Sequence, residues 1–113
     1  MPGVSIHVVD VSRGLVAAGM KVELLTEGRV IAAGLISAKG LLDEKSLEGR
    51  FSPGAYEAVF YVGAWYRQQS VALPAVPFLD VVHYGFGIAE PQQHYHLPFK
   101  CSPWGYSCFR GGA

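Results

Sequence analysis

The sequence has few charged residues and no excess of either sign of charge. Only 16% of its 113 residues are charged, and nine lysines and arginines balance nine aspartates and glutamates, so the formal net charge is zero. Proteins that bind nucleic acid or anionic membranes attract them with an excess of positive charge. The balance therefore argues against both, and we expect neither nucleic acid nor a membrane as a partner.

Long apolar runs and cysteines are also few. No stretch reaches the about 20 consecutive apolar residues that a membrane-spanning helix needs. The opening MPGVSIHVVDV lacks the features of a secretory signal, so the expected location is the cytoplasm. The two cysteines, Cys101 and Cys108, are then expected to be reduced. The sequence holds neither a CxxC motif nor a cysteine–histidine zinc pattern, so no metal is expected.

Apolar residues, by contrast, are plentiful and make up half of the chain. A chain of this length fits one domain, which we place at residues 1–113. It can bury a core without the help of a disulfide or a metal. A small neutral domain with many apolar residues also tends to associate, so we expect an oligomer.

Strand-forming residues dominate the chain. Alternating or valine-rich segments predict β-strands at residues 5–11, 20–27, 29–36, 56–62, 79–88, 94–101 and 106–109. Segment 37–54 is polar and rich in glycine, and we expect a loop that can hold one short strand. Residues 63–70 can form a short helix, and prolines keep the following segment extended. Many short strands separated by turns indicate an all-β sandwich or barrel.

Alternation within two strands sorts their side chains into two faces. In the strand at 94–101, the apolar face expected in the core carries Tyr95, Leu97, Phe99 and Cys101. The opposite face carries His94, His96, Pro98 and Lys100. In the first strand, His7 shares a face with Ser5 and is opposite the apolar Ile6. Both His7 and His96 are therefore expected to lie away from the main core.

Three segments resemble one known family. The stretch IHVVDVSRGLVAAGMKVEL is similar to the opening signature of transthyretin-like proteins. HYHLPFKCSPWGYSCFRGG is similar to the closing signature of 5-hydroxyisourate hydrolases, and PGAYEAVFYVGAWY resembles the family's PGTYE strand and the segment after it. The resemblance covers nearly the whole chain. It implies a two-sheet transthyretin-like sandwich, to which the sequence adds one short helix.

The resemblance also implies a function and an assembly. Enzymes of this family open the lactam ring of 5-hydroxyisourate in urate catabolism, a part of purine metabolism, without a metal or cofactor. They are homotetramers built from edge-strand dimers, and the small-molecule substrate binds in a channel between subunits. We therefore expect a cofactor-free cyclic amide hydrolase, acting on 5-hydroxyisourate or a related ring. The alternative is a non-catalytic member that binds a small ligand in the channel, as transthyretin does.

The family's site residues can be carried over position by position. The two signature histidines are His7 and His96, which are the expected catalytic residues. The family's arginine follows a mid-chain glycine that aligns with Gly40, so Leu41 takes its place. Arg50 also follows a glycine, but it lies in a segment where the family has no catalytic arginine. The closing Tyr-Arg-Gly-Ser of the family reads Phe109, Arg110, Gly111 and Gly112.

The chemical steps of lactam hydrolysis show which catalytic group is lost with these residue changes. The reaction needs a base for water, a donor for the oxyanion and an acid for the leaving nitrogen. Histidine suits the first and last of these tasks, but leucine cannot replace arginine as the donor. Lys100, four residues after His96, is the candidate for the missing charge. The expected substrate-binding residues are Lys100, Leu41, Ser107, Phe109, Arg110 and Gly112.

Each of these residues also has a plainer interpretation. A strand histidine or lysine is usually a solvated surface residue, and Arg110 can simply pair with a surface carboxylate. Leu41, Phe109 and Gly112 favour the binding protein or a changed substrate. The two surviving histidines favour the hydrolase and place it slightly ahead.

Overall fold

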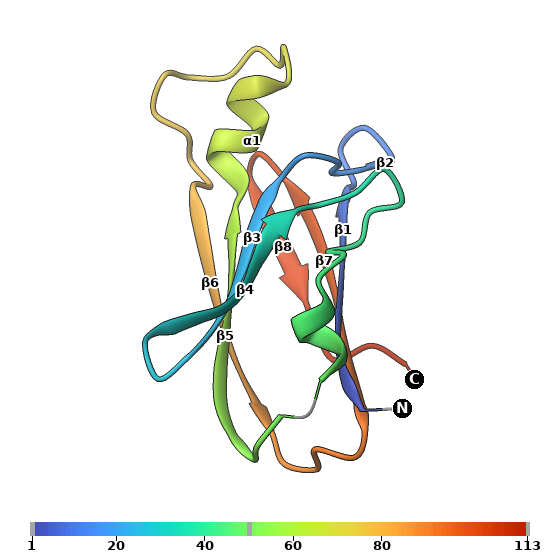
Figure 1. The fold of residues 1–113 in the computed structure, drawn as a ribbon. Helices are drawn as coiled ribbons and strands as arrows, with labels where there is room; N and C mark the ends of the chain where they lie inside the picture. The colour runs from blue at the N-terminus through green and yellow to red at the C-terminus, as the bar shows by residue number, and fades with distance from the viewer. Residues whose placement is uncertain (1, 50, 113) are drawn as a thin grey trace.

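The computed structural model describes residues 2–49 and 51–112, which form two packed four-stranded sheets (Figure 1). The first sheet contains, in spatial order, β2 (Leu15–Val16), β1 (Gly3–Asp10), β7 (His94–Ser102) and β8 (Gly105–Cys108). The second contains β4 (Arg29–Leu35), β3 (Lys21–Thr26), β5 (Gly54–Tyr61) and β6 (Val81–Ile88). Helix α1 (Val62–Gln68) follows β5, and the 3-10 helix η1 (Lys45–Glu48) lies between β4 and β5. No helix in the described ranges is long and apolar enough to cross a membrane.

The predicted all-β sandwich is confirmed, and its predicted strands and helix lie within two residues of the observed bounds. Strand β2 was not predicted, because a two-residue strand is too short to show alternation; it exists through its pairing with β1. Segment 37–54 contains η1, and its last residue begins β5. Two of its residues, Leu41 and Leu42, make isolated bridges in place of the short strand that the sequence allowed. Arg50 lies outside the described residues.

The core lies between the sheets and follows the predicted alternation. Every second residue of β1 and β7 is buried, including Ile6, Val8, Leu97 and Phe99. Phe60 of β5 stacks on Phe99 of β7 with ring centroids 3.8 Å apart. Burying a side chain of this size stabilises the fold by about 1.5–3 kcal/mol. The same alternation turns the polar residues of β1 and β7 outward, apart from Asp10 at the end of β1, which is buried.

Parallel pairing of β1 with β7 joins the two ends of the chain. Figure 1 shows the blue β1 lying beside the orange β7 along their length. The register sets Ser5 opposite His96 and His7 opposite Pro98. Two segments that are about 90 positions apart in the sequence are thus neighbours on one face.

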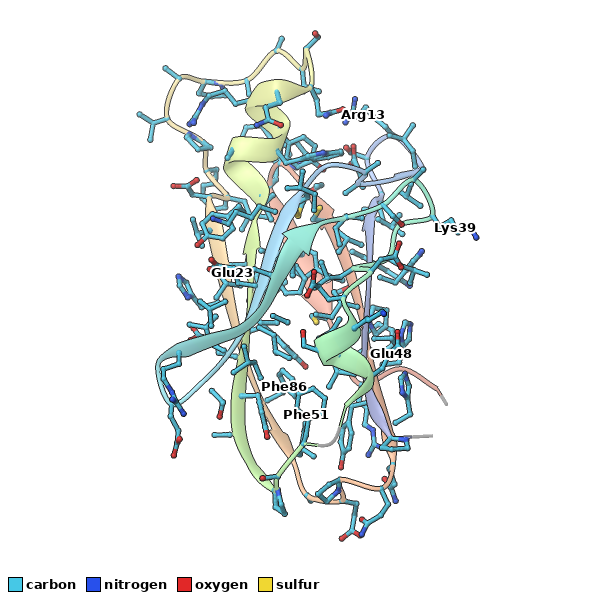
Figure 2. The ribbon with its side chains drawn as sticks, viewed as in Figure 1. Arg13, Glu23, Lys39, Glu48, Phe51 and Phe86 are labelled. Carbon is cyan, nitrogen blue, oxygen red and sulfur yellow. The ribbon has the colours of Figure 1, made fainter. Side chains whose placement is uncertain are left out.

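Asp10 is the one buried charged residue among those described, and it organises the turn after β1. Its carboxylate accepts hydrogen bonds from Ser12, from the Tyr66 hydroxyl at 2.6 Å and from Arg13 at 2.7 Å. Figure 2 shows Arg13 beside helix α1, where its guanidinium lies 5.4 Å from the centroid of the Trp65 ring. Desolvation alone raises the pKa of Asp10, but these hydrogen bonds outweigh it, so the pKa lies below its usual value.

We expect Tyr66→Phe to lower the free energy of unfolding by about 1.5–3 kcal/mol at pH 7, the range for a hydrogen bond to a charged group. Because the pKa of Asp10 is lowered on folding, this contribution is fully present above the unfolded value of about 3.8. It is lost as pH falls through the folded value. Urea unfolding over a pH series measures it, with Tyr106→Phe as the control at an exposed tyrosine. Equal losses for the two variants would contradict the prediction.

Candidate active site

The outer face of the first sheet gathers the polar residues singled out in the sequence. Alternation along β1 and β7 turns them away from the core, and pairing with β7 adds one residue from β8. All are half-buried except the last two, which are exposed. This histidine face consists of Ser5 and His7 from β1, His94 and His96 from β7, Lys100 from β7 and Ser107 from β8.

His7 lies beside the loop that follows β4. The Val8 amide donates to the Gly40 carbonyl at 2.9 Å, and the Leu42 amide donates to the Ile6 carbonyl at 3.2 Å. These bonds make Leu41 the antiparallel bridge partner of His7. Directly opposed residues share a face, so the half-buried Leu41 side chain lies beside the imidazole. Leu41, the position predicted from the sequence to replace the family's arginine, is therefore adjacent to His7.

Gly40 permits this close approach. Its φ of +83° favours glycine, and a Cβ there would come within 2.7 Å of His7 Nε2 and 2.8 Å of Val16 Cγ1. The loop backbone thus packs directly against the imidazole. Lys39, the preceding residue, is exposed and its side chain points outward from the molecule (Figure 2).

Lys100 lies on the histidine face, as the alternation predicted. It is exposed, whereas its neighbours Phe99 and Cys101 are buried. Its Nζ lies 5.6 Å from the centroid of the Phe109 ring, within cation–π range. Lys100 is two residues from Pro98, the partner of His7, which is a distance of about 7 Å along the strand. A lysine side chain can reach across that distance.

Ser5 joins two histidines. Its Oγ lies 2.6 Å from Nδ1 of His96 and 2.8 Å from Nε2 of His94. The other ring nitrogen of His96, Nε2, has no hydrogen-bond partner in the described part of the chain. His96 is therefore anchored through one nitrogen, and the second is available to a ligand.

The pKa of His96 lies below the usual histidine value. Desolvation by burial is the largest cause, and the electrostatic effects of His7 and His94 act in the same direction. A hydrogen bond to the Ser5 backbone opposes the shift. His96 therefore remains neutral to lower pH than a free histidine, and the neutral imidazole is the form that accepts a proton.

The C-terminal segment lies against His96. The Gly111 amide donates to the His96 carbonyl at 2.7 Å. A Cβ on Gly111 would come within 2.7 Å of His96 Cδ2, so only glycine fits without movement. Arg110 turns elsewhere: its guanidinium stacks on Tyr95 at 3.9 Å from the ring centroid and donates to Gln93 at 2.8 Å. Phe109 and Gly112, which flank Arg110 and Gly111 in the sequence, are both exposed.

The structure thus brings together residues that the sequence did not connect. Sequence reasoning placed Ser5 on the face of His7 and His94 on the face of His96 but gave neither a role in the site. The missing information was the register of β1 against β7, which alone sets Ser5 opposite His96. Among the described residues, no group of three His, Cys, Asp or Glu side chains is arranged to hold a metal ion.

Two stacked four-stranded sheets with this strand order, and a helix following β5, define a transthyretin-like sandwich. The chain belongs to the HIUase/Transthyretin family, whose model matches residues 4–111.

Named relatives narrow the comparison. A 5-hydroxyisourate hydrolase of Pseudomonas aeruginosa is 43% identical over 110 residues, covering 93% of this chain and 87% of the relative. The 5-hydroxyisourate hydrolase 2 of Rhizobium meliloti is 40% identical, with 93% and 92% covered. The solved structure of Klebsiella pneumoniae 5-hydroxyisourate hydrolase superposes with a TM-score of 0.83 at 29% identity, covering 99% of this chain and 100% of that one.

Proposed function

We propose that this protein hydrolyses 5-hydroxyisourate by opening its lactam ring. The observation that carries the proposal is that His7 and His96 lie on one face, with Nε2 of His96 available to a ligand. Strong similarity to proteins named 5-hydroxyisourate hydrolase over nearly the full chain supports the same substrate.

The chemistry divides between the two histidines. His96 Nε2 takes a proton from water as the water oxygen bonds to the lactam carbonyl carbon. The carbonyl oxygen becomes an oxyanion, and collapse of this intermediate breaks the carbon–nitrogen bond. The leaving nitrogen takes a proton from a histidine, His7 or the newly protonated His96. The products are a carboxylate and the freed nitrogen, and no redox step occurs.

A cation for the oxyanion has to come from outside the loop, because Leu41 occupies the arginine position. We assign this role to Lys100, which lies on the histidine face. It is two residues along β7 from Pro98, the partner of His7. Ser107 and Phe109 border Lys100, and Leu41 and Gly112 complete the substrate-binding set. Arg110 joins this set only if its guanidinium leaves Tyr95 and Gln93, which it contacts in this structure. An ammonium is a point charge without the bidentate geometry of a guanidinium, so Lys100 is a weaker substitute.

We further propose that the protein works as a homotetramer in the cytoplasm, with the histidine face lining a channel between subunits. Strands β6 and β8 lie at the edges of their sheets, where unpaired backbone groups can pair with a second copy. Light scattering of the purified protein tests the assembly. A monomer at micromolar concentration would contradict it.

The test of function generates the substrate in place. Urate oxidase converts urate to 5-hydroxyisourate, whose decay is followed with and without this protein at catalytic concentration. We expect accelerated, saturable decay. An unchanged decay rate with folded protein would exclude the hydrolase function and favour the alternative of a non-catalytic ligand-binding protein.

We expect the acidic limb of kcat/KM to have its midpoint below pH 6.5, because kcat/KM reports the free enzyme and the pKa of His96 is lowered. The base works when neutral, so activity falls as pH drops through this lowered value. Initial rates between pH 5 and 8, corrected for spontaneous decay, measure the limb. A midpoint at or above the ordinary histidine value of about 6.5 would contradict the assignment.

A further inference from the structure

The contacts of Ser5 set a limit on the protons of the histidine face. A hydroxyl has one proton to donate and two lone pairs to accept. Ser5 Oγ lies within hydrogen-bond distance of His96 Nδ1 at 2.6 Å and of His94 Nε2 at 2.8 Å. Because Ser5 has one hydroxyl proton, it can donate to only one of the two rings, so at least one ring must donate its own N–H to Ser5. The tautomers of the two rings are coupled to this extent: they cannot both present a lone pair to Ser5.

In two complementary arrangements Ser5 donates to one ring and accepts from the other. In the first, His96 donates from Nδ1 to Ser5 and Ser5 donates to His94 Nε2, so His96 Nε2 carries a lone pair and can act as a base. In the second, His94 donates from Nε2 to Ser5 and Ser5 donates to His96 Nδ1, so His96 Nε2 carries the proton and can act as an acid. Each arrangement presents one of the two forms of His96 that hydrolysis requires.

We propose that Ser5 is a positioning residue for the reaction, holding His96 by Nδ1 and coupling its tautomer to that of His94. The proposal rests on the hydrolase function and adds to it two residues that the sequence left without a role. Ser5 touches no reacting atom and acts through His96. His94 serves as the second proton holder.

Surroundings of the three residues support this division. The Cδ2 edge of the His96 ring faces Gly111, which fixes the side of the ring opposite Ser5. Ser5 and His94 line a hollow of about 270 Å³ that is also bordered by Leu41 and by the acidic residues Asp43, Glu44 and Glu48. His94 thus contacts the half-buried Ser5 hydroxyl and also borders an open hollow that is lined in part by carboxylates.

Proton transfer through this chain balances. When His96 Nε2 takes the water proton, its Nδ1 proton moves to Ser5 and the hydroxyl proton of Ser5 moves to His94 Nε2. His94 becomes the imidazolium, and His96 is neutral with a proton on Nε2. As that proton passes to the leaving nitrogen, His94 returns its extra proton through Ser5 to His96 Nδ1, so both rings are neutral at the end of the step.

Steady-state kinetics of four variants test the proposal. We expect Ser5→Ala to lower kcat by about 10- to 100-fold with KM changed less than about threefold, because only proton transfer is affected. Ser5→Thr keeps the hydroxyl and should restore kcat to within about fivefold of the wild type. His94→Phe should match Ser5→Ala, whereas Ser70→Ala, at an exposed serine following α1, should leave kcat unchanged. An unchanged kcat in Ser5→Ala, or failure of Ser5→Thr to exceed it, would overturn the proposal.

Nitrogen-15 NMR of the histidine rings tests the coupling without substrate, so it stands even if the hydrolase assignment fails. The His96 ring signals are assigned by their loss in His96→Asn. We expect Ser5→Ala to shift Nδ1 of His96 and Nε2 of His94 together, while Ser70→Ala shifts neither. Unmoved signals in Ser5→Ala would show that the contact is absent in solution and would overturn the proposal. If the wild-type protein is inactive but the His96 and His94 signals shift together in Ser5→Ala, only the assigned substrate is rejected.

Discussion

Replacing His96 with asparagine is expected to lower kcat for ring opening by about 10²- to 10⁴-fold, the range that a positioned acid–base group supplies. Asparagine preserves a polar side chain of similar reach at a half-buried site, so the sandwich should stay folded. Loss of Nε2 removes the proton acceptor for water. Initial rates on 5-hydroxyisourate generated in place, after correction for spontaneous decay, measure the effect.

A matched histidine serves as the control. His83 lies on β6 in the second sheet, where its Nδ1 is 2.8 Å from Glu57, and it has no part in the histidine face. His83→Asn should leave kcat within about twofold of the wild type, as expected for a surface change away from the chemistry. If His83→Asn and His96→Asn reduced kcat equally, the effect would be structural and the assignment of His96 would be wrong.

Replacing Leu41 with arginine is expected to raise kcat by about 10²-fold. Leu41 is the bridge partner of His7, so a guanidinium there would lie beside the imidazole and could donate to the developing oxyanion. One such donor is worth on the order of 10²–10³ in rate. The position is half-buried, which leaves room for the longer side chain to reach the outer face. Values of kcat and KM for the wild type and the variant measure the gain.

Combining Leu41→Arg with a substitution at Lys100 tests this second prediction more strictly. If Lys100 supplies the charge in the wild type, Lys100→Met should lose activity, and adding Leu41→Arg should restore it. Leu35→Arg, an equivalent change at an exposed residue of β4, controls for added charge and should give no gain. No increase in folded Leu41→Arg would mean that the loop position does not receive the arginine of the family.

Much of the fold could be predicted because its signals are local. Alternation in 94–101 separated the buried Leu97 and Phe99 from the outward His96 and Lys100, and the structure confirms this separation. β2 escaped because two residues show no period, and it forms only through its pairing with Val9 and Asp10. The loop at 37–54 contributes single bridges whose partners lie in other strands, which no local pattern encodes.

The site was only partly readable for the same reason. His7 and His96 were found through signatures, and each could be placed on its own strand. Their relation to one another depends on the parallel register of β1 and β7, which joins residues about 90 positions apart. Ser5 thus became a neighbour of both His94 and His96 only when the sheet was assembled. The roles of Gly40 and Gly111 likewise depend on the assembled structure, because a Cβ at either position would come within 3 Å of a histidine ring atom.

One rate comparison tests the central claim most directly: decay of 5-hydroxyisourate with wild-type protein against decay with the His7→Asn, His96→Asn double variant. The account predicts that the wild type accelerates decay in proportion to its concentration and that the folded double variant leaves it at the spontaneous rate. Equal rates for the two proteins would contradict it, because the histidine face would then have no part in the chemistry.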